Sequence, residues 1–312
     1  MNIFRGRKKK KELSPEEKIR RRRAWWKVVL IMLGLLLISE LISGLLYRMV
    51  KPHLHGISDG MVFVLKNYGT TLGAFLIFPL YMLWRTPEIA ADLQPARTDA
   101  APERLAGNTM PMFLLGLLLG GGSNALCILL AWLHGDVKFV TGNIEWGTIL
   151  LALLLVFVQS SSEEFMFRGY VLGSLRRRYS KWTAIIFSAF FFMALHLGNP
   201  GATFLAMADV AAIGFTYAIC VCYGKSIWMT MGMHTAWNFT QNFIFGLPNS
   251  GLVSECSLLK LDAASASDSL FYSTGFGIEG SLPAFLIDAL LGVIIFFICT
   301  RKLNRRLRHK KM

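Results

Sequence analysis

The sequence predicts an all-α fold, a polytopic membrane helix bundle with about eight transmembrane helices. Of its 312 residues, 54% are hydrophobic and only 17% are charged, and the mean hydropathy is +0.48. This composition is typical of a chain that crosses a membrane several times. Separate apolar runs, each close to the length that crosses about 30 Å of hydrocarbon, indicate the individual helices. We find no internal repeat and no soluble domain of useful size.

The apolar runs give the order of the expected helices. A helix that crosses the hydrocarbon needs about 20 predominantly apolar residues. The expected spans are residues 28–47, 68–84, 112–133, 146–172, 182–197, 202–222, 226–245 and 282–299. An even number of spans places both ends of the chain on the same side of the membrane.

The positive charge is concentrated at the two ends of the chain. Residues 1–23 contain eleven Lys or Arg and residues 301–312 contain seven, within a net charge of +14. The connections on the same side as these tails hold eight more, and the opposite connections hold five. Because cytoplasmic loops carry an excess of Lys and Arg, we expect a cell-membrane protein with both termini cytoplasmic. Basic tails beside apolar spans fit contact with anionic lipids, and we expect no nucleic-acid partner.

One connection is much longer than the others. Residues 246–281 are acidic and rich in Ser, Ala and Gly, so we expect an extracytoplasmic loop that is either disordered or a partial lid. Four cysteines lie in apolar spans and only Cys256 lies in this loop, so the sequence indicates no disulfide.

A cluster of ionisable residues interrupts the fourth expected span. Glu163 and Glu164 are adjacent, and Arg168 follows. Each such group near a bilayer centre costs roughly 2.5 to 3.5 kcal/mol, so the three need partners, a water-filled cavity or a reaction. Glu164 and Arg168 are four residues apart and can pair on one helix face, and a structural ion pair explains these two as well as a function does. Glu163 is turned about 100° away and keeps no such partner, so we interpret it as functional.

Two histidines and an asparagine lie within later spans. At about 1.5 Å per residue from the nearest cytoplasmic Lys or Arg, Glu163, His196 and His234 lie roughly 20, 22 and 14 Å deep. Asn238 is one turn beyond His234 and shares its helix face. A lone histidine in a helix bundle is more often a packing residue, but three helices that bring ionisable groups to one layer favour a common site.

Three short motifs contain these residues. They are Glu163-Glu164-x-x-x-Arg168, Phe192-x-x-x-His196 and His234-x-x-x-Asn238. Their order and internal spacing resemble the signature of the CPBP intramembrane proteases, which comprise type II CAAX prenyl proteases and bacteriocin-processing or immunity (Abi) proteins. Any one motif is weak, whereas the three together are specific. On this basis the chain divides into a basic tail (1–23), N-terminal transmembrane helices (24–145), a CPBP-like catalytic core (146–245), the outer loop (246–281) and a last helix with a basic tail (282–312).

The resemblance implies hydrolysis of a peptide bond within the bilayer. Glu163 with His196 would activate a water molecule, and His234 with Asn238 would stabilise the oxyanion. Glu164 with Arg168 would orient the first carboxylate. Glu163, His196 and His234 could also form an open Zn²⁺ site, but a metal-free Glu/His peptidase needs the same residues. Both a metalloendopeptidase and a metal-free enzyme therefore remain open, and we favour the second.

The expected substrate is a membrane-associated or lipidated peptide. The short loops and basic tails suit a bacterial member of the family, whose target the sequence does not identify. Two other functions compete with proteolysis. A proton-coupled transporter would use intramembrane carboxylates and imidazoles, and Glu40, Lys66, Asp209 and Asp288 would fit such a path. A non-catalytic immunity or scaffold protein would keep the fold without needing every motif residue, and this chain has them all.

Overall fold

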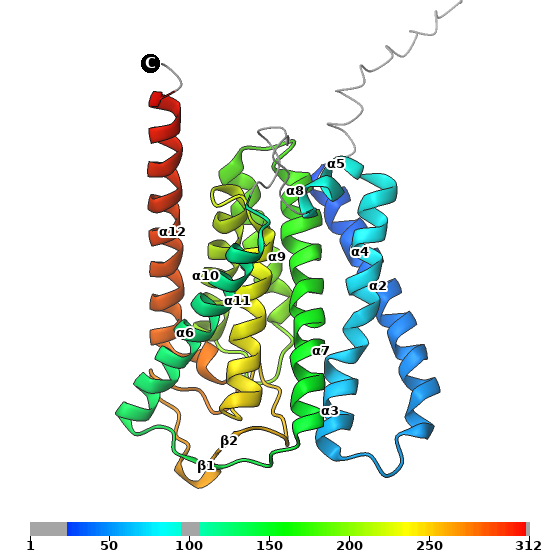
Figure 1. Ribbon diagram of the computed structural model, residues 1–312, viewed down its shortest axis with the longest axis vertical. Helices are drawn as coiled ribbons and strands as arrows, with labels where there is room; N and C mark the ends of the chain where they lie inside the picture. The colour runs from blue at the N-terminus through cyan, green and yellow to red at the C-terminus, as the bar shows by residue number, and fades with distance from the viewer. Residues whose placement is uncertain (1–23, 95–106, 310–312) are drawn as a thin grey trace, which may run out of the picture.

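The computed structural model describes residues 24–94 and 107–309, and it is a bundle of helices with almost no sheet (Figure 1). The predicted tail at residues 1–23 lies outside the described residues. The predicted all-helical membrane bundle is thus confirmed.

The helices and strands follow one another in this order along the chain. The N-terminal part contains α2 (Trp25–Val50), η1 (Lys51–His53), α3 (Asp59–Asn67), η2 (Gly69–Thr71), α4 (Leu72–Arg85), α5 (Pro87–Ala90), η3 (Ala91–Leu93) and α6 (Met110–His134). After β1 (Phe139–Thr141) come α7 (Trp146–Glu164), η4 (Phe165–Val171), α8 (Leu172–Leu175), α9 (Lys181–His196), α10 (Phe204–Cys222), α11 (Ile227–Phe239) and η5 (Thr240–Ile244). The chain ends with β2 (Leu259–Leu261), η6 (Ala263–Ser265), η7 (Ile278–Gly280) and α12 (Leu282–His309).

All eight predicted spans correspond to helices, but they differ in length. Among the described residues, six helical segments are long and apolar enough to cross a membrane. The other two predicted spans correspond to α9, which has 16 residues, and α11, which has 13 residues and continues into η5. At 1.5 Å per residue, α9 is about 24 Å long, so it ends before it crosses about 30 Å of hydrocarbon.

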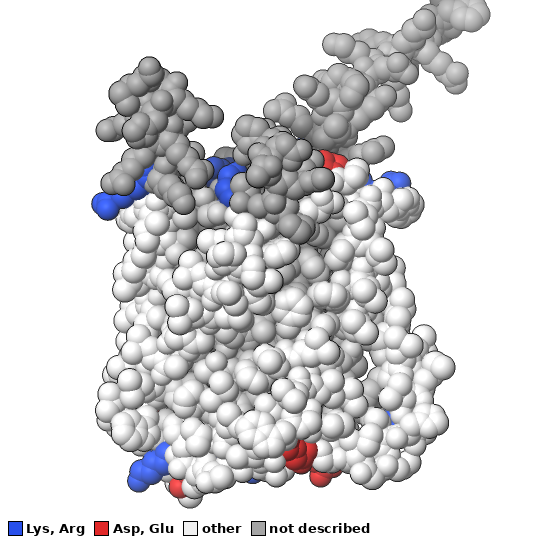
Figure 2. Space-filling model, viewed as in Figure 1, with Lys and Arg blue, Asp and Glu red and all other residues white. Residues whose placement is uncertain are grey.

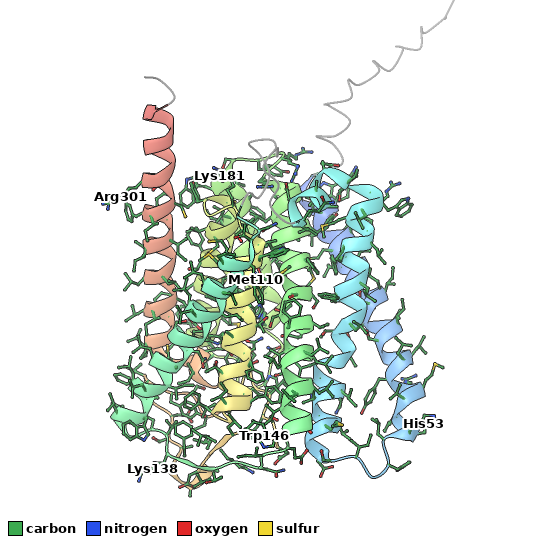
Figure 3. The ribbon with its side chains drawn as sticks, in the orientation of Figure 1. His53, Met110, Lys138, Trp146, Lys181 and Arg301 are labelled. Atoms are coloured by element: carbon green, nitrogen blue, oxygen red, sulfur yellow. The ribbon has the colours of Figure 1, made fainter. Side chains whose placement is uncertain are left out.

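The charged residues lie at the two ends of the bundle. In the face shown in Figure 2, the described Lys, Arg, Asp and Glu side chains lie near these ends, and the band between them shows none. Lys181 and Arg301 are near one end, and His53, Lys138 and Trp146 are near the other (Figure 3). An uncharged band of this kind matches the hydrocarbon layer of a bilayer.

The sequence predicts that the long connection after α11 is either disordered or a partial lid. In the structure it is ordered and covers one end of the bundle. Its strand β2 pairs antiparallel with β1, with Val140 opposite Lys260. The side chains of Leu247, Tyr272 and Phe276 are fully buried. Asp136, just after α6, accepts hydrogen bonds from two serines of the connection. These contacts hold residues 246–281, hereafter the covering loop, against the end of the bundle.

Helix α11 is packed closely against α6. A Cβ at Gly116 would lie 2.2 Å from the carbonyl oxygen of Met229, and one at Gly120 would lie 2.0 Å from that of Met233. Only glycine allows this approach, and small residues are what membrane helices use for close backbone contact. The Asn124 side chain also donates to Gln241 Oε1 at 2.8 Å. Together these contacts fix the position of α11.

The predicted orientation can be tested by cysteine labelling. Ser267 lies exposed on the covering loop, and Asn2 lies outside the described residues. We expect Ser267→Cys to react with a membrane-impermeant maleimide on intact cells, and Asn2→Cys to react only after permeabilisation, because the basic tails favour the cytoplasm. The wild-type protein provides the background from its own cysteines. Labelling of Asn2→Cys alone on intact cells would reverse the assigned orientation.

Candidate active site

The first motif lies where α7 changes its helical geometry. The α-helix ends at Glu164, and the next seven residues form the π-helix η4, which contains Arg168. π-Helical turns are rare and often occur at functional sites. Glu164 and Arg168 have fully buried side chains, whereas that of Glu163 is 21% exposed. The two neighbouring glutamates therefore occupy different environments, as their helical spacing predicts.

Glu164 is the centre of a buried charge network. Its Oε1 accepts a hydrogen bond from Arg168 Nη1 at 3.0 Å and lies 3.2 Å from His234 Nδ1. The predicted ion pair is therefore present, and the sequence did not indicate its link to His234. Since a carboxylate only accepts, this contact places a proton on His234 Nδ1. Glu164 of the first motif thereby orients the imidazole ring of His234 in the third motif.

Aromatic rings surround the Arg168 guanidinium. It lies 4.3 Å from the ring centroid of Phe192 and 5.0 Å from that of Tyr217. Its Nη2 donates to the Gly214 carbonyl oxygen at 3.2 Å. Guanidinium groups are more weakly hydrated than ammonium groups and stack on aromatic faces, so Arg can be buried here where Lys could not be. Phe192, the first residue of the second motif, thus supports the first motif.

The two histidines face the same region from different helices. His196 is the last residue of α9, and its Nδ1 is 2.8 Å from the Phe192 carbonyl oxygen. This carbonyl can only accept, so in neutral His196 the other ring nitrogen, Nε2, is an acceptor. His234 Nε2 lies 3.8 Å from Glu163 Oε2. Glu163 Oε2 is buried and receives no hydrogen bond from the described residues.

Asn238 is held by neighbouring polar side chains. Its Nδ2 donates to Gln159 Oε1 at 3.1 Å and to Ser160 Oγ at 3.3 Å. Its Oδ1 accepts from Asn249 Nδ2, a residue of the covering loop, at 3.2 Å. Gln159 Nε2 also donates to Glu163 Oε1. Gln159 therefore connects the amide of the third motif with the carboxylate of the first.

These residues line a cavity of about 280 Å³. Glu163, His196, His234 and Asn238 all contribute to its wall. Glu164 and Arg168 lie behind this wall and act on it through His234. The structure thus brings together the four residues that were predicted to touch a substrate. This arrangement agrees with the similar depths that were predicted for Glu163, His196 and His234.

The covering loop contributes a further carboxylate, Glu279, which the sequence did not single out. It accepts from Trp237 Nε1 at 3.2 Å, from Asn249 Nδ2 at 3.1 Å and from Ser250 through both its backbone nitrogen and its hydroxyl. Burial raises the pKa of Glu279 above its ordinary value, and the Ser250 hydrogen bonds oppose this effect. Glu279 therefore attaches the loop to α11 at the cavity. The only signal in the sequence is its place three residues before an apolar helix.

The side chains that could bind zinc do not converge on one point. Among the described residues, no three His, Cys, Asp or Glu side chains are placed to hold a metal ion. Glu163, His196 and His234 therefore share a cavity without forming a preorganised zinc site. His234 uses its Nδ1 for Glu164, and His196 uses its Nδ1 for Phe192.

A comparison with protein-family models supports the resemblance stated from the motifs. Residues 145–240 match a model described as Rce1-like, type II CAAX prenyl endopeptidase Rce1-like. No curated protein matches the chain. The matched segment starts just before α7 and ends just after α11, so it contains all three motifs. The motifs and this match therefore point to the same segment of the chain, which is similar to the Rce1-like type II CAAX prenyl endopeptidase model.

Proposed function

We propose that the protein is an intramembrane endopeptidase that hydrolyses a peptide bond of a membrane-associated substrate. The observation that carries the proposal is the shared cavity, in which a carboxylate with a free oxygen faces two imidazoles and a side-chain amide. A general base and hydrogen-bond donors to the developing oxyanion, within one cavity, are what addition of water to an amide requires.

In the proposed mechanism, Glu163 removes a proton from a water molecule in the cavity. The resulting hydroxide attacks the carbonyl carbon of the scissile bond, and negative charge develops on the carbonyl oxygen. Asn238 Nδ2 stabilises this oxygen by exchanging its hydrogen bond with Gln159 or Ser160 for one to the substrate. His234 Nε2 donates to the same oxygen in its imidazolium form. Glu163 then gives its proton to the amide nitrogen, the C–N bond breaks, and a carboxylic acid and an amine are released.

His196 has a supporting part in this mechanism. With Nδ1 committed to the Phe192 carbonyl, its Nε2 can accept a hydrogen bond from the water and orient it for Glu163. Glu164, Arg168 and Phe192 act as positioning residues, since they hold His234 and one another. Of the three, Phe192 lines the cavity, whereas Glu164 and Arg168 do not. The cavity borders the covering loop, so we propose that substrate and water both enter it from that end of the bundle.

The proposal is tested by peptide cleavage. Peptides from membranes of cells that contain the wild-type protein or Glu163→Gln are compared by mass spectrometry, and candidate sequences are then cut by the two purified proteins. Fragments that depend on Glu163 support the proposal. Identical peptide sets together with no cleavage by the purified wild-type protein contradict it.

We propose the metal-free form of this mechanism and expect zinc chelation to leave cleavage unchanged. The donor arrangement supports this, because catalytic zinc sites typically use three converging protein ligands. The measurements are elemental analysis of purified active protein and cleavage rates before and after treatment with a chelator. Asn238→Ala, which removes an oxyanion donor, should lower the rate by about 100- to 1,000-fold. One zinc per active protein that disappears in His234→Ala would overturn this form.

A further inference from the structure

We propose that Asp209, backed by Asp288, forms a subsite of the cavity that binds a cationic group of the substrate, a Lys or Arg side chain or a free amine. The inference rests on the proposed peptidase function and names a feature of its substrate. Neither residue belongs to the three motifs.

The two aspartates come from facing helices. Asp209 lies on α10 and Asp288 on α12, and both are 1% exposed. The Thr216 hydroxyl donates to the Asp288 carbonyl oxygen at 2.8 Å, which ties the two helices together near this point. Asp209 Oδ1 and both side-chain oxygens of Asp288 are buried and receive no hydrogen bond from the described residues. Two carboxyl groups with unpartnered oxygens thus lie on facing helices within the bundle.

The two carboxyl groups have no basic partner. Burial without a partner disfavours their charged form, whereas a cation beside Asp209 would stabilise its carboxylate. No Lys, Arg or His among the described residues forms an ion pair with either aspartate, and Asp209 Oδ1 receives no hydrogen bond from them. An uncompensated buried carboxylate is costly, so a partner from outside the chain is favoured.

Asp209 brings its carboxyl group to the wall of the cavity. Asp209 lines the cavity, whereas Asp288 does not. Glu163 and Glu279 are the other two carboxyl groups in the lining, which includes no Lys or Arg. Glu279 already accepts four hydrogen bonds. Asp209 is therefore the carboxyl group of the cavity that is available to a cation without disturbing either the proposed base or the loop attachment.

The chemistry of the cavity identifies the kind of cation. A metal ion such as Ca²⁺ takes six to eight oxygen ligands, and the described residues offer no cluster of that kind. An ammonium or guanidinium group needs only one or two carboxylate oxygens and brings its own donors. The same lining includes no Lys or Arg that could pair with a substrate C-terminal carboxylate. The arrangement therefore fits an internal peptide bond near a basic residue, or one near an amino terminus.

Binding can be measured without catalysis. The probe is n-butylammonium, which mimics the end of a Lys side chain, and n-butanol is its neutral counterpart. We expect n-butylammonium, but not n-butanol, to raise the thermal unfolding temperature of the wild-type protein in detergent. Asp209→Asn should bind n-butylammonium at least about tenfold more weakly, because it removes a carboxylate that lines the cavity. Asp288→Asn should bind it about as well as wild type, because Asp288 does not line the cavity. No difference between the two probes on wild type, or equal binding by Asp209→Asn, would overturn the subsite.

Substrate preference gives the second test. The probe is a library of N-palmitoylated peptides, randomised at eight positions and cleaved in detergent. Hydrogen bonds to charged groups predict a preference of about 10- to 100-fold for Lys over Gln at one position near the cut. This preference should vanish in Asp209→Asn and persist in Asp288→Asn. Cleavage without any basic preference overturns the subsite alone. Selective binding of n-butylammonium by a protein that cuts no peptide overturns the proposed function alone.

Discussion

Glu163→Gln is expected to reduce peptide cleavage by about 100- to 10,000-fold, the range that a general base contributes. The substitution removes the proton acceptor while keeping size and polarity, and the new amide oxygen can still accept the hydrogen bond from Gln159. Expression and thermal unfolding should therefore remain close to wild type. The measurement is the initial rate of cleavage by purified proteins of a peptide that the wild-type protein cuts.

A matched control separates this loss from a general effect of removing a carboxylate. Glu40 lies exposed on α2 and does not line the cavity. Glu40→Gln should cut the same peptide at the wild-type rate. Turnover by Glu163→Gln within a factor of a few of wild type would rule out Glu163 as the base.

Removing either partner of the buried Glu164–Arg168 pair is expected to cost about 3 to 5 kcal/mol of stability, because the remaining charge is left in the bundle core. Both side chains are fully buried, so little solvent screening is available. Glu164→Gln with Arg168→Gln should lose much less than the sum of the two single changes. The measurement is the free energy of unfolding in detergent for the wild type, both single variants and the double variant.

An exposed pair on the covering loop is the control. Lys260 and Glu255 are 3.6 Å apart, with side chains 50% and 65% exposed. Their single and double Gln variants should each change stability by less than about 1 kcal/mol and should add. If the changes at Glu164 and Arg168 also simply add, the two residues are not coupled.

Helix positions and the motif residues were accessible from the sequence because they depend on local order. Apolar runs predicted every long helix, and the i,i+4 spacing predicted the contact between Glu164 and Arg168. The counted depths of Glu163, His196 and His234 predicted a shared layer, and all three line one cavity. Each of these inferences uses only helix rise, helix rotation and the cost of charge in hydrocarbon.

The rest depends on contacts between segments far apart in the chain. The sequence indicated Asp209 and Asp288 only as residues that would fit a proton path, and only the packing of α10 on α12 brings their two helices together. Glu279 reaches Trp237 across 42 positions. The composition of the covering loop left disorder open, since Ser, Ala and Gly do not show which few side chains, such as Tyr272 and Phe276, will be buried.

The proposed transport alternative receives little support from the positions of its residues. Glu40 and Lys66 are exposed and take no part in the cavity wall. Asp209 alone of the four lines the space that Glu163 and the histidines share. Glu163, Asp209 and Glu279 therefore line one cavity, and Glu40 and Lys66 do not extend it into a path across the bundle.

The close packing of α6 against α11 gives a helix without any motif residue a part in catalytic precision. The backbone of α11 rests on Gly116 and Gly120, so the distance between the two helix axes is set by atoms that cannot be repacked by a rotamer change. His234 and Asn238 follow these contact points by a few residues on the same helix. A displacement of about 1 Å at reacting groups can cost roughly 100-fold in rate. The glycines of α6 therefore fix the position of the helix that bears His234 and Asn238, the proposed oxyanion donors.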